Sequence, residues 1–482
     1  MMIAFDNTYA RLPEKFYSRT KPTPVANPRL VKLNTALAEL LGLDVALLSS
    51  DAGARILAGN VIPEGADPIA LAYAGHQFGS FVPQLGDGRA ILLGEVVGKD
   101  GRRRDIQLKG SGPTPFSRRG DGRAALGPVL REYIVSEAMA AMGIPTTRSL
   151  AAITTGEPVY RENVMPGAVL TRVAASHIRV GTFEYFAARE DREALATLTR
   201  YALERHYPES VGAQNPALAL LEHVIDAQAS LIARWLGVGF VHGVMNTDNT
   251  AISGETIDYG PCAFLDEYNP RKKWSSIDHA GRYAFMSQPR IAQWNLTRFA
   301  ECILPLLNDD TDQAIQMATD RLNAFPARFE PAFAGVLRKK LGFTDDRDTD
   351  LPLALDLLGR MAAHEVDYTL FFRRLCDAAE NPSADERCAA MFQDPGAFHE
   401  WAPRWRARQP DASVMRGANP AYIPRNHRIE EALRAAASQG DFKPFERLVE
   451  VLSKPFEEQV GAEDLAEPPA PEQRVRQTFC GT

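Results

Sequence analysis

One polar loop, entered directly from a long helix, constrains the fold of this 482-residue chain more than any other feature. Apolar residues recur at helical spacing over 217–236, and Pro216 stands where proline suits the first turn of a helix. The loop that follows, 242–249, reads HGVMNTDN, and Asp258 comes nine residues after Asn249. Because Mg²⁺ prefers hard oxygen ligands, an amide and a carboxylate at this spacing predict a divalent-cation site. An ordinary Asn/Asp turn is the alternative.

We expect a short hairpin between these two residues. The runs TAIS and TIDYG have the composition of strands and flank Gly254, which suits a tight turn. Asp258 then follows the second strand and begins the tripeptide Asp258-Tyr259-Gly260.

The part of the chain before the long helix predicts an antiparallel sheet with one helix. ILLGEVV and DIQLKG are separated by the turn 99–101, a pattern typical of a meander. Apolar residues at helical spacing predict a helix over 126–142, which Gly143 and Pro145 would end. TRSLAAITT and AVLTRVA predict two more strands, and most of the chain beyond Phe183 has helical patterns. The predicted fold class is therefore α+β.

This order divides the chain into five parts. We expect an irregular N-terminal segment (1–70) with one helix near Arg29–Leu41, a nucleotide-binding sheet region (71–182), a region that carries the polar loops (183–290), a helical C-terminal region (291–467) and a flexible tail (468–482).

Two loops in the sheet region have compositions suited to phosphate. Gly86-Asp87-Gly88-Arg89 precedes a strand, and glycines let backbone amides approach phosphate oxygens closely. Taken alone, that tetrapeptide favours a plain type I′ hairpin turn over a phosphate loop. The second loop, 117–123, contains three arginines and two glycines, so it is either a solvated loop or a polyphosphate cradle. Arg172 and Arg179 are two further cations, suited to phosphate or simply solvated.

A lysine on a strand can hold phosphate when a helix carboxylate pairs with it. Lys109 ends the strand DIQLK, and two glutamates of the following helix, Glu132 and Glu137, are candidate partners. Periodicity alone does not choose between them, and a solvated lysine is the alternative.

The order of these features resembles that of protein kinases: glycine loop, strand lysine, helix glutamate, long helix, asparagine and Asp-x-Gly. Kinases place a catalytic aspartate shortly after the loop histidine, whereas His242-Gly243 is followed here by Val244. Asp248 adjoins the asparagine and can take over as proton acceptor. The expected architecture is a kinase-like two-lobed fold, with a sheet-and-helix N-lobe and a mainly helical C-lobe that has a C-terminal helical extension.

Four strings identify the chain as a member of a known family. YAGHQFGSFVPQLGDGRAILLGEV, IQLKGSGPTPFSRRGDGRAALGPVLREYIVSEAM, HGVMNTDNTAISGETIDYGPCAFLDEY and NPAYIPRNH resemble the selenoprotein O family of protein adenylyltransferases, long classed among the pseudokinases. The resemblance covers nearly the whole chain. It implies transfer of AMP from ATP, or of UMP from UTP, to Ser, Thr or Tyr hydroxyls of proteins, including the chain itself, with release of pyrophosphate. It also implies that ATP binds flipped relative to kinases and that Mg²⁺ or Mn²⁺ assists.

The resemblance also assigns roles to residues, and it selects Glu132 over Glu137. It implies Asp248 as proton acceptor and Asn249 and Asp258 as metal ligands. The nucleotide-binding residues that it implies are Gly86, Gly88, Arg89, Lys109, Asp121, Gly122, Glu132, Arg172, Arg179 and Asp258. Two other readings remain: a small-molecule kinase, against which Val244 argues, and a catalytically inactive ATP-binding pseudokinase scaffold, against which the retained metal ligands argue.

Composition limits the other functions. The net charge of −7 argues against a general nucleic-acid binder, because tracking phosphates requires excess Lys and Arg. The chain has no CxxC pair, no secretory signal at its start and no apolar run near the roughly 20 residues of a membrane span. We expect a cytoplasmic protein without membrane or nucleic-acid partners. Some family members carry selenocysteine where Cys480 stands; a local dithiol is excluded here, while a distant disulfide, for example to Cys262, stays open.

Overall fold

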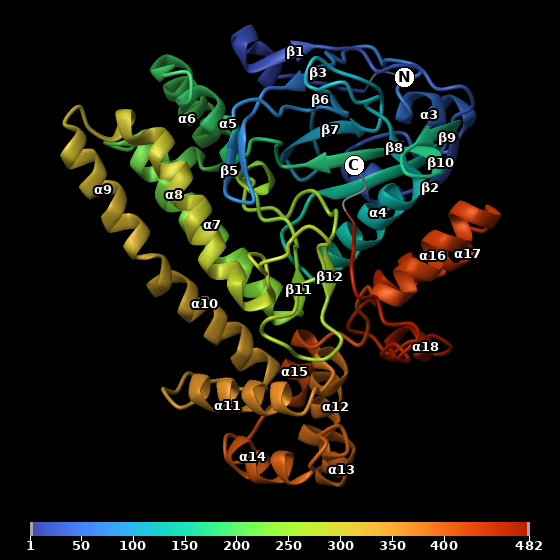
Figure 1. Cartoon of the computed structure of the whole chain (residues 1–482), viewed down its shortest axis with the longest axis vertical. Coiled ribbons are helices and arrows are strands. Elements are labelled where there is room, and N and C mark those ends of the chain that lie inside the picture. The colour runs from blue at the N-terminus through green and yellow to red at the C-terminus, as the bar shows by residue number, and fades with distance from the viewer. Residues whose placement is uncertain (1–2, 480–482) are drawn as a thin grey trace.

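An antiparallel sheet forms one half of the structure, and helices form the other (Figure 1). The computed structural model describes residues 3–479. The main sheet runs in the order β1-β3-β6-β7-β10-β9-β2, and β8 also pairs with β10. The strands are β1 Tyr17–Arg19, β2 Arg29–Leu33, β3 Ile69–Leu71, β6 Ala90–Val97, β7 Arg103–Lys109, β8 Ala124–Ala125, β9 Arg148–Tyr160 and β10 Val164–Ala174.

Helices cover both faces of this sheet. On one face lie α1 (Thr35–Leu40), α2 (Val45–Leu48) and α3 (Asp51–Leu57), whose apolar side chains share a core with Ile106 and Leu108 of β7. The other face carries α4 (Leu126–Ala141), which packs against β9 and β10. Because side chains alternate along a strand, Gln107 and Lys109 lie on the α4 side. The predictions of the strands β6, β7, β9 and β10 and of the helix α4 are confirmed.

The prediction of an irregular segment 1–70 with a single helix near Arg29–Leu41 is wrong, because that segment contains α1, α2 and α3 as well as three strands of the sheet. Residues 29–33 form β2, which pairs with β9 at the edge of the sheet. The helix α1 begins only after Asn34, whose side chain accepts a hydrogen bond from the Leu37 amide. Pairing with a neighbouring strand overrides the helical pattern there, and an Asx cap marks the true start.

The long predicted helix is confirmed as α7, Pro216–Gly237. Asn215 caps it by accepting from the Leu218 amide, and the helix packs against α8 and α10. Its buried face includes Val224, Ile225 and Ile232, which are fully inaccessible. The neighbouring helices are α5 Val180–Ala187, α6 Arg192–His206, α8 Gln288–Leu307, α9 Thr311–Asn323 and α10 Phe325–Lys340.

The C-terminal helices build a second core and then return to the sheet. Trp401 and Trp405 stack within the second core, and their helix α14 lies at the end of the molecule opposite the main sheet (Figure 1). The helices α16 and α17 then pack against α4. These helices are α11 Asp350–Ala363, α12 Tyr368–Glu380, α13 Asp385–Ala389, α14 Gly396–Arg406, α15 Ala412–Ala418, α16 Asn426–Gln439, α17 Lys443–Leu452 and α18 Glu463–Ala466.

The described part of the tail is docked, although its composition favoured flexibility. The Trp274 indole donates to the Val475 carbonyl, and the Thr478 hydroxyl donates to the Pro261 carbonyl at 2.6 Å. Thr478 also forms a parallel bridge with Ser275. These hydrogen bonds and the bridge hold in place a segment that has many polar side chains. Cys480 lies outside the described residues, and within residues 3–479 no helix is both long and apolar enough to cross a membrane.

Candidate active site: a cation-rich cavity

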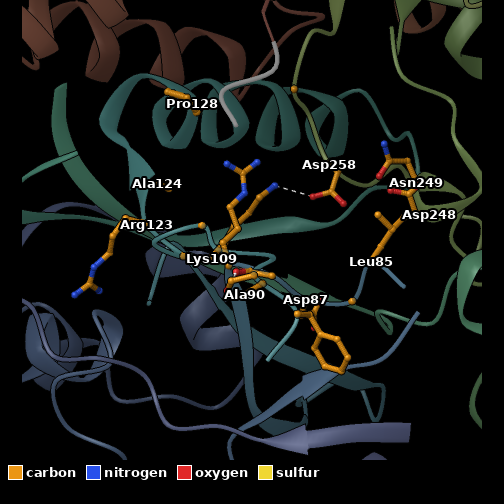
Figure 2. Close-up of a pocket in the computed structure, with 18 of the residues that line it drawn as sticks. Leu85, Asp87, Ala90, Lys109, Arg123, Ala124, Pro128, Asp248, Asn249 and Asp258 are labelled. Carbon is orange, nitrogen blue, oxygen red and sulfur yellow. Dashed lines mark hydrogen bonds and ion pairs between the residues drawn. The ribbon is translucent and has the colours of Figure 1, made fainter. Parts of the chain in front are cut away.

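A cavity of about 690 Å³ lies between the main sheet, α4 and the polar loops that follow α7 (Figure 2). Its lining includes eight Lys or Arg side chains against five Asp or Glu side chains. The cavity is therefore locally positive although the chain as a whole carries −7. An anionic ligand suits this excess.

Asp258 is the point on which three of these cations converge. Its Oδ1 accepts from Lys109 Nζ and from Arg172 Nη1, both at 2.7 Å, and its Oδ2 accepts from Arg179 Nη1 at 3.0 Å. Burial alone would raise the pKa of Asp258, but these three cations outweigh it and hold that pKa well below the ordinary value. Its backbone is left-handed, with φ of +62°, a strained conformation that is typical of functional positions.

The structure pairs Lys109 with Glu132 and not with Glu137. Lys109 Nζ lies 2.6 Å from Glu132 Oε2. Glu137 instead forms an ion pair with Arg148 at 2.6 Å. Five residues along a helix turn a side chain by about 140°, so the two glutamates cannot face the same strand. Both acidic side chains lie on α4, and the structure bears out the choice of Glu132 that the family resemblance implied and periodicity left open.

Arg172 and Arg179 are buried, so their interpretation as solvated arginines is wrong. Each is 2% exposed. Arg172, on β10, donates to Gln107 Oε1 at 2.6 Å and to Glu132 Oε1 at 3.2 Å. Arg179 precedes α5, donates to the Asp248 carbonyl at 2.7 Å and stacks over the Tyr73 ring, whose centroid is 4.5 Å away. Buried arginines of this kind need carboxylate and carbonyl partners, and both have them.

Sequence reasoning missed the polar residues behind these cations. Gln107 donates to Asp87 Oδ2 at 3.1 Å, and the Leu71 amide donates to the same oxygen. Burial raises the pKa of Asp87 to about 6. Gln107 lies two residues before Lys109, on the same face of β7, and that alternation was the signal that could have found it.

The glycine loop before β6 is not a plain hairpin turn. The amides of Gly86 and Asp87 donate to the carbonyls of Tyr73 and Leu71, so the loop lies against the end of β3. Gly86 has a φ of +66°, and a Cβ there would come within 2.3 Å of the Phe116 ring. A second anchor is the Thr114 hydroxyl, which donates to the Asp87 carbonyl at 2.7 Å. The loop therefore presents Gly88 and Arg89 to the cavity, as the phosphate hypothesis requires.

Asp248 lies on a short 3₁₀ turn, Thr247–Asn249, at the end of the cavity opposite Arg123 (Figure 2). Gln77 Nε2 donates to Asp248 Oδ2 at 3.2 Å, while the buried Oδ1 has no hydrogen-bond partner among the described residues. Burial raises the pKa of Asp248 to about 6, although Arg179 and Gln77 act in the opposite direction. The hairpin of β4 (Gly75–Gln77) and β5 (Ser80–Val82) packs closely against the Asp248 side chain. A Cβ on Gly75 would lie 2.8 Å from Asp248 Oδ1.

Asn249 and Asp258 line the same cavity, and their oxygens suit a hard cation. Asn249 Nδ2 donates to the Val244 carbonyl at 3.0 Å, which leaves Asn249 Oδ1 without a hydrogen-bond partner in the described chain. Amide and carboxylate oxygens are the donors that Mg²⁺ and Mn²⁺ accept, so the pair fits such an ion. No group of three or more His, Cys, Asp or Glu suited to a metal occurs within residues 3–479.

The predicted hairpin between these two residues is absent from the described structure. Ala251 bridges to Arg179, and Thr256 bridges in parallel to Thr146, so each run pairs with a distant segment instead of its neighbour. A hydrogen bond of 2.9 Å between His242 Nε2 and the Ile257 carbonyl holds the residue that precedes Asp258. Long-range partners compete for the backbone groups that a local hairpin would have used.

The loop 117–123 forms the rim of the cavity opposite Asp258. Asp121 is exposed, and both of its carboxylate oxygens accept from Arg161, at 2.8 and 3.0 Å. Gly122 has a φ of +64°, and a Cβ there would collide with the Gly112 backbone. Arg123 lies at the opposite end of the cavity from Asp258, with Lys109 between them (Figure 2). All the predicted site residues thus line one cavity.

Comparison with known proteins assigns the chain to a family. The sequence profile of the family described as "Protein adenylyltransferase SelO" matches residues 1–453. The chain belongs to the SelO family. It is 61% identical to a "Protein nucleotidyltransferase YdiU" of Bradyrhizobium diazoefficiens over 99% of both chains. Proteins of the same name from a second Bradyrhizobium strain and from Methylorubrum populi are 62% and 60% identical, over at least 99% of each chain.

Membership of the SelO family makes the chain a nucleotidyltransferase, and a nucleoside triphosphate is the substrate of such an enzyme. The expected family resemblance is confirmed. The cavity has features that suit a nucleoside triphosphate: clustered cations and a buried carboxylate within one enclosure.

Proposed function

We propose that this SelO-family chain transfers AMP from ATP to Ser, Thr or Tyr hydroxyls of proteins and releases pyrophosphate. The observation that carries the proposal is the separation of two carboxylates. Asp258 is tied to three cations, while Asp248 keeps a buried Oδ1 without a hydrogen-bond partner within residues 3–479. The first suits binding of phosphate and metal, and the second suits removal of a proton.

A kinase-like two-lobed organisation is part of this proposal. The sheet with α4 would form the N-lobe, and the helices around α7 the C-lobe, with 291–467 as the extension and 468–482 as the tail. The pairing of Lys109 with Glu132 on α4, and the position of Asp258 opposite that pair, support the assignment.

The proposed acceptor lies on the Asp248 side of the cavity. Val244 takes the sequence position of the kinase base, and its side chain cannot accept a proton. We assign that role to Asp248, which requires the α-phosphate of ATP to face this end and the nucleotide to be flipped relative to kinases. The acceptor oxygen would form a bond to the α-phosphorus as its proton passes to Asp248 Oδ1. The bond from the α-phosphorus to the α,β-bridging oxygen would break, and pyrophosphate would keep the electron pair.

Asn249 and Asp258 would hold the Mg²⁺ or Mn²⁺ ion, which supplies neutralisation of phosphate charge. Lys109, Arg172 and Arg179 would bind the phosphates and orient the α-phosphorus. The burial of Arg172 and Arg179 strengthens their contacts because water is excluded. Gly86, Gly88, Arg89, Asp121 and Gly122 would line the rest of the nucleotide site.

Labelled ATP tests the proposal directly. Purified protein is incubated with ATP labelled at the α- or the γ-phosphate, with Mg²⁺ or Mn²⁺, and label on protein is measured, the chain itself included as acceptor. We expect label from the α-phosphate only. Label from the γ-phosphate only indicates a kinase, and ATP binding without any label across added protein substrates indicates a scaffold. Labelled UTP in parallel decides whether UMP is transferred.

A further inference from the structure

Two arginines on the rim of the cavity differ from every other cation that lines it. Within residues 3–479, Arg118 and Arg119 form no ion pair or hydrogen bond, and both side chains are exposed. Lys109, Arg172 and Arg179 bind Asp258, and Arg161 binds Asp121. Both unpaired arginines nevertheless line the cavity. Their guanidinium groups are therefore not neutralised by any carboxylate within residues 3–479.

Their backbone is held in an unfavourable conformation. Arg118 and Arg119 have φ angles of +46° and +75°, two consecutive left-handed residues that are neither glycine nor asparagine. Such strain persists only where surrounding contacts enforce it, and it concentrates at ligand-binding loops.

The contacts that enforce it tie this turn to the glycine loop. The Ser117 hydroxyl donates to the Gly88 carbonyl and accepts from the Thr114 amide at 2.8 Å. On the other side, the Gly120 amide donates to the Ser117 carbonyl at 2.7 Å. Arg118 and Arg119 therefore lie on a turn that Ser117 holds against Gly88 by a hydrogen bond.

We propose that Arg118 and Arg119 form the subsite for the two terminal phosphates of the nucleotide and hold pyrophosphate as it leaves. This inference rests on the proposed function. Displacement at phosphorus places the leaving oxygen opposite the attacking oxygen. The acceptor enters beside Asp248, so the leaving group extends toward the opposite end of the cavity, where Arg123 of the same loop lies (Figure 2).

The chemistry of the leaving group fits this pair. When the bond from the α-phosphorus to the α,β-bridging oxygen breaks, negative charge develops on the departing pyrophosphate. Two guanidinium groups without carboxylate partners can bind its oxygens without first breaking an ion pair. Exposure at the rim also gives the product a route out.

The test compares nucleotides that differ only in the terminal phosphates. Affinities for α,β-methylene-ATP and for AMP are measured by calorimetry on the full chain with Mg²⁺. The variant is R118N/R119N, because asparagine tolerates the left-handed region. We expect affinity for the triphosphate to fall about 10–100-fold and affinity for AMP to change less than about 3-fold, the range for charge-assisted hydrogen bonds. Inhibition by free pyrophosphate should weaken in parallel.

Matched controls separate a subsite from a change in net charge. R55N/R102N removes two exposed arginines outside the cavity and should leave both affinities unchanged. R118K/R119K keeps the charge without the planar fork and should lie between wild type and the asparagine variant. Equal weakening of AMP and the triphosphate, or no weakening of either, overturns the subsite. If wild type labels protein only from the γ-phosphate, the proposed AMP transfer fails, while selective loss of triphosphate binding would still locate the terminal phosphates at these arginines.

Discussion

Two regions of the molecule bury cations in opposite ways. In the cavity, Lys109, Arg172 and Arg179 share the carboxylate of Asp258, and Glu132 binds two of them. In the C-terminal helical core, Lys340 is 2% exposed and forms no ion pair within residues 3–479. Its Nζ lies instead 4.2 and 5.0 Å from the ring centroids of Phe372 and Tyr368.

The two regions differ in whether a buried cation has a carboxylate partner, and this difference affects its charge. Burial lowers the pKa of Lys340 to about 7, so this lysine can discard its charge near neutral pH. The cavity cations are instead paired with carboxylates, which hold them in place around a site for an anionic substrate. Another buried cation outside the cavity, Arg425 immediately before α16, is paired: its guanidinium binds Asp367 at 2.6 Å and Asp266 at 3.2 Å.

The largest expected effect comes from removing the carboxylate shared by the cavity cations. Asp258→Ala removes the carboxylate that Lys109 and the buried Arg172 and Arg179 share, and with it a proposed metal ligand. We expect transfer of α-label to fall below about one-thousandth of wild type, as when a preorganised electrostatic group is lost. Lys109→Ala should likewise abolish transfer. Retained activity in either variant, measured with folded protein, would contradict these roles.

Asp248→Asn comes next, because it removes only the proton acceptor. We expect transfer to fall about 10²–10⁴-fold, the usual contribution of a general base. Binding of α,β-methylene-ATP should stay close to wild type, since no cavity cation depends on the Asp248 carboxylate. Parallel loss of binding and transfer would instead make Asp248 a structural residue of the site.

Arg425→Met tests a buried ion pair away from the cavity. It leaves Asp266 and Asp367 without their cation, and breaking such a pair typically costs about 3–5 kcal/mol of unfolding free energy. Denaturant unfolding at pH 7 measures this loss. Arg434→Met, an exposed arginine on α16 that forms no ion pair within residues 3–479, serves as the control and should change stability by less than about 0.5 kcal/mol.

Lys340→Met should change stability in the opposite direction. Below pH 7 the lysine is charged in both the folded and the unfolded state, so the folded state bears the full cost of burying it. Between about pH 7 and the ordinary lysine pKa of 10.5, the folded state is neutral while the unfolded state is still charged, so wild-type stability rises with pH. The variant should therefore melt higher than wild type at pH 6, and the gap should close toward pH 10.

The exposed neighbour Lys339 supplies the control for that experiment. Lys339→Met should shift the melting temperature equally at both pH values. A gap for Lys340→Met that does not depend on pH would show that the buried lysine stays charged, held by the two aromatic rings. That result would make the two regions alike in keeping their cations ionised.

Local patterns were sufficient for much of the fold. Alternation and turn residues predicted β6 and β7, helical spacing predicted α4 and α7, and each is found within a few residues of its expected bounds. They failed at β2 and at the expected hairpin after Asn249, where backbone groups pair with distant segments. The prediction of a flexible tail failed for the same reason, because the partners of Val475 and Thr478 lie some 200 residues earlier in the chain.

The sequence by itself determined the family, the α+β class and the residues of the cavity, because these depend on residue types in a fixed order. Only the tertiary structure showed the pairing of Lys109 with Glu132, which the family resemblance had implied and spacing had left open. It also placed Gln107 and Asp87 behind Arg172, and left Arg118 and Arg119 without partners within residues 3–479. The physical reason is that ion pairing depends on the direction and distance of side chains. Those quantities arise when separate elements pack together, and no spacing along one element contains them.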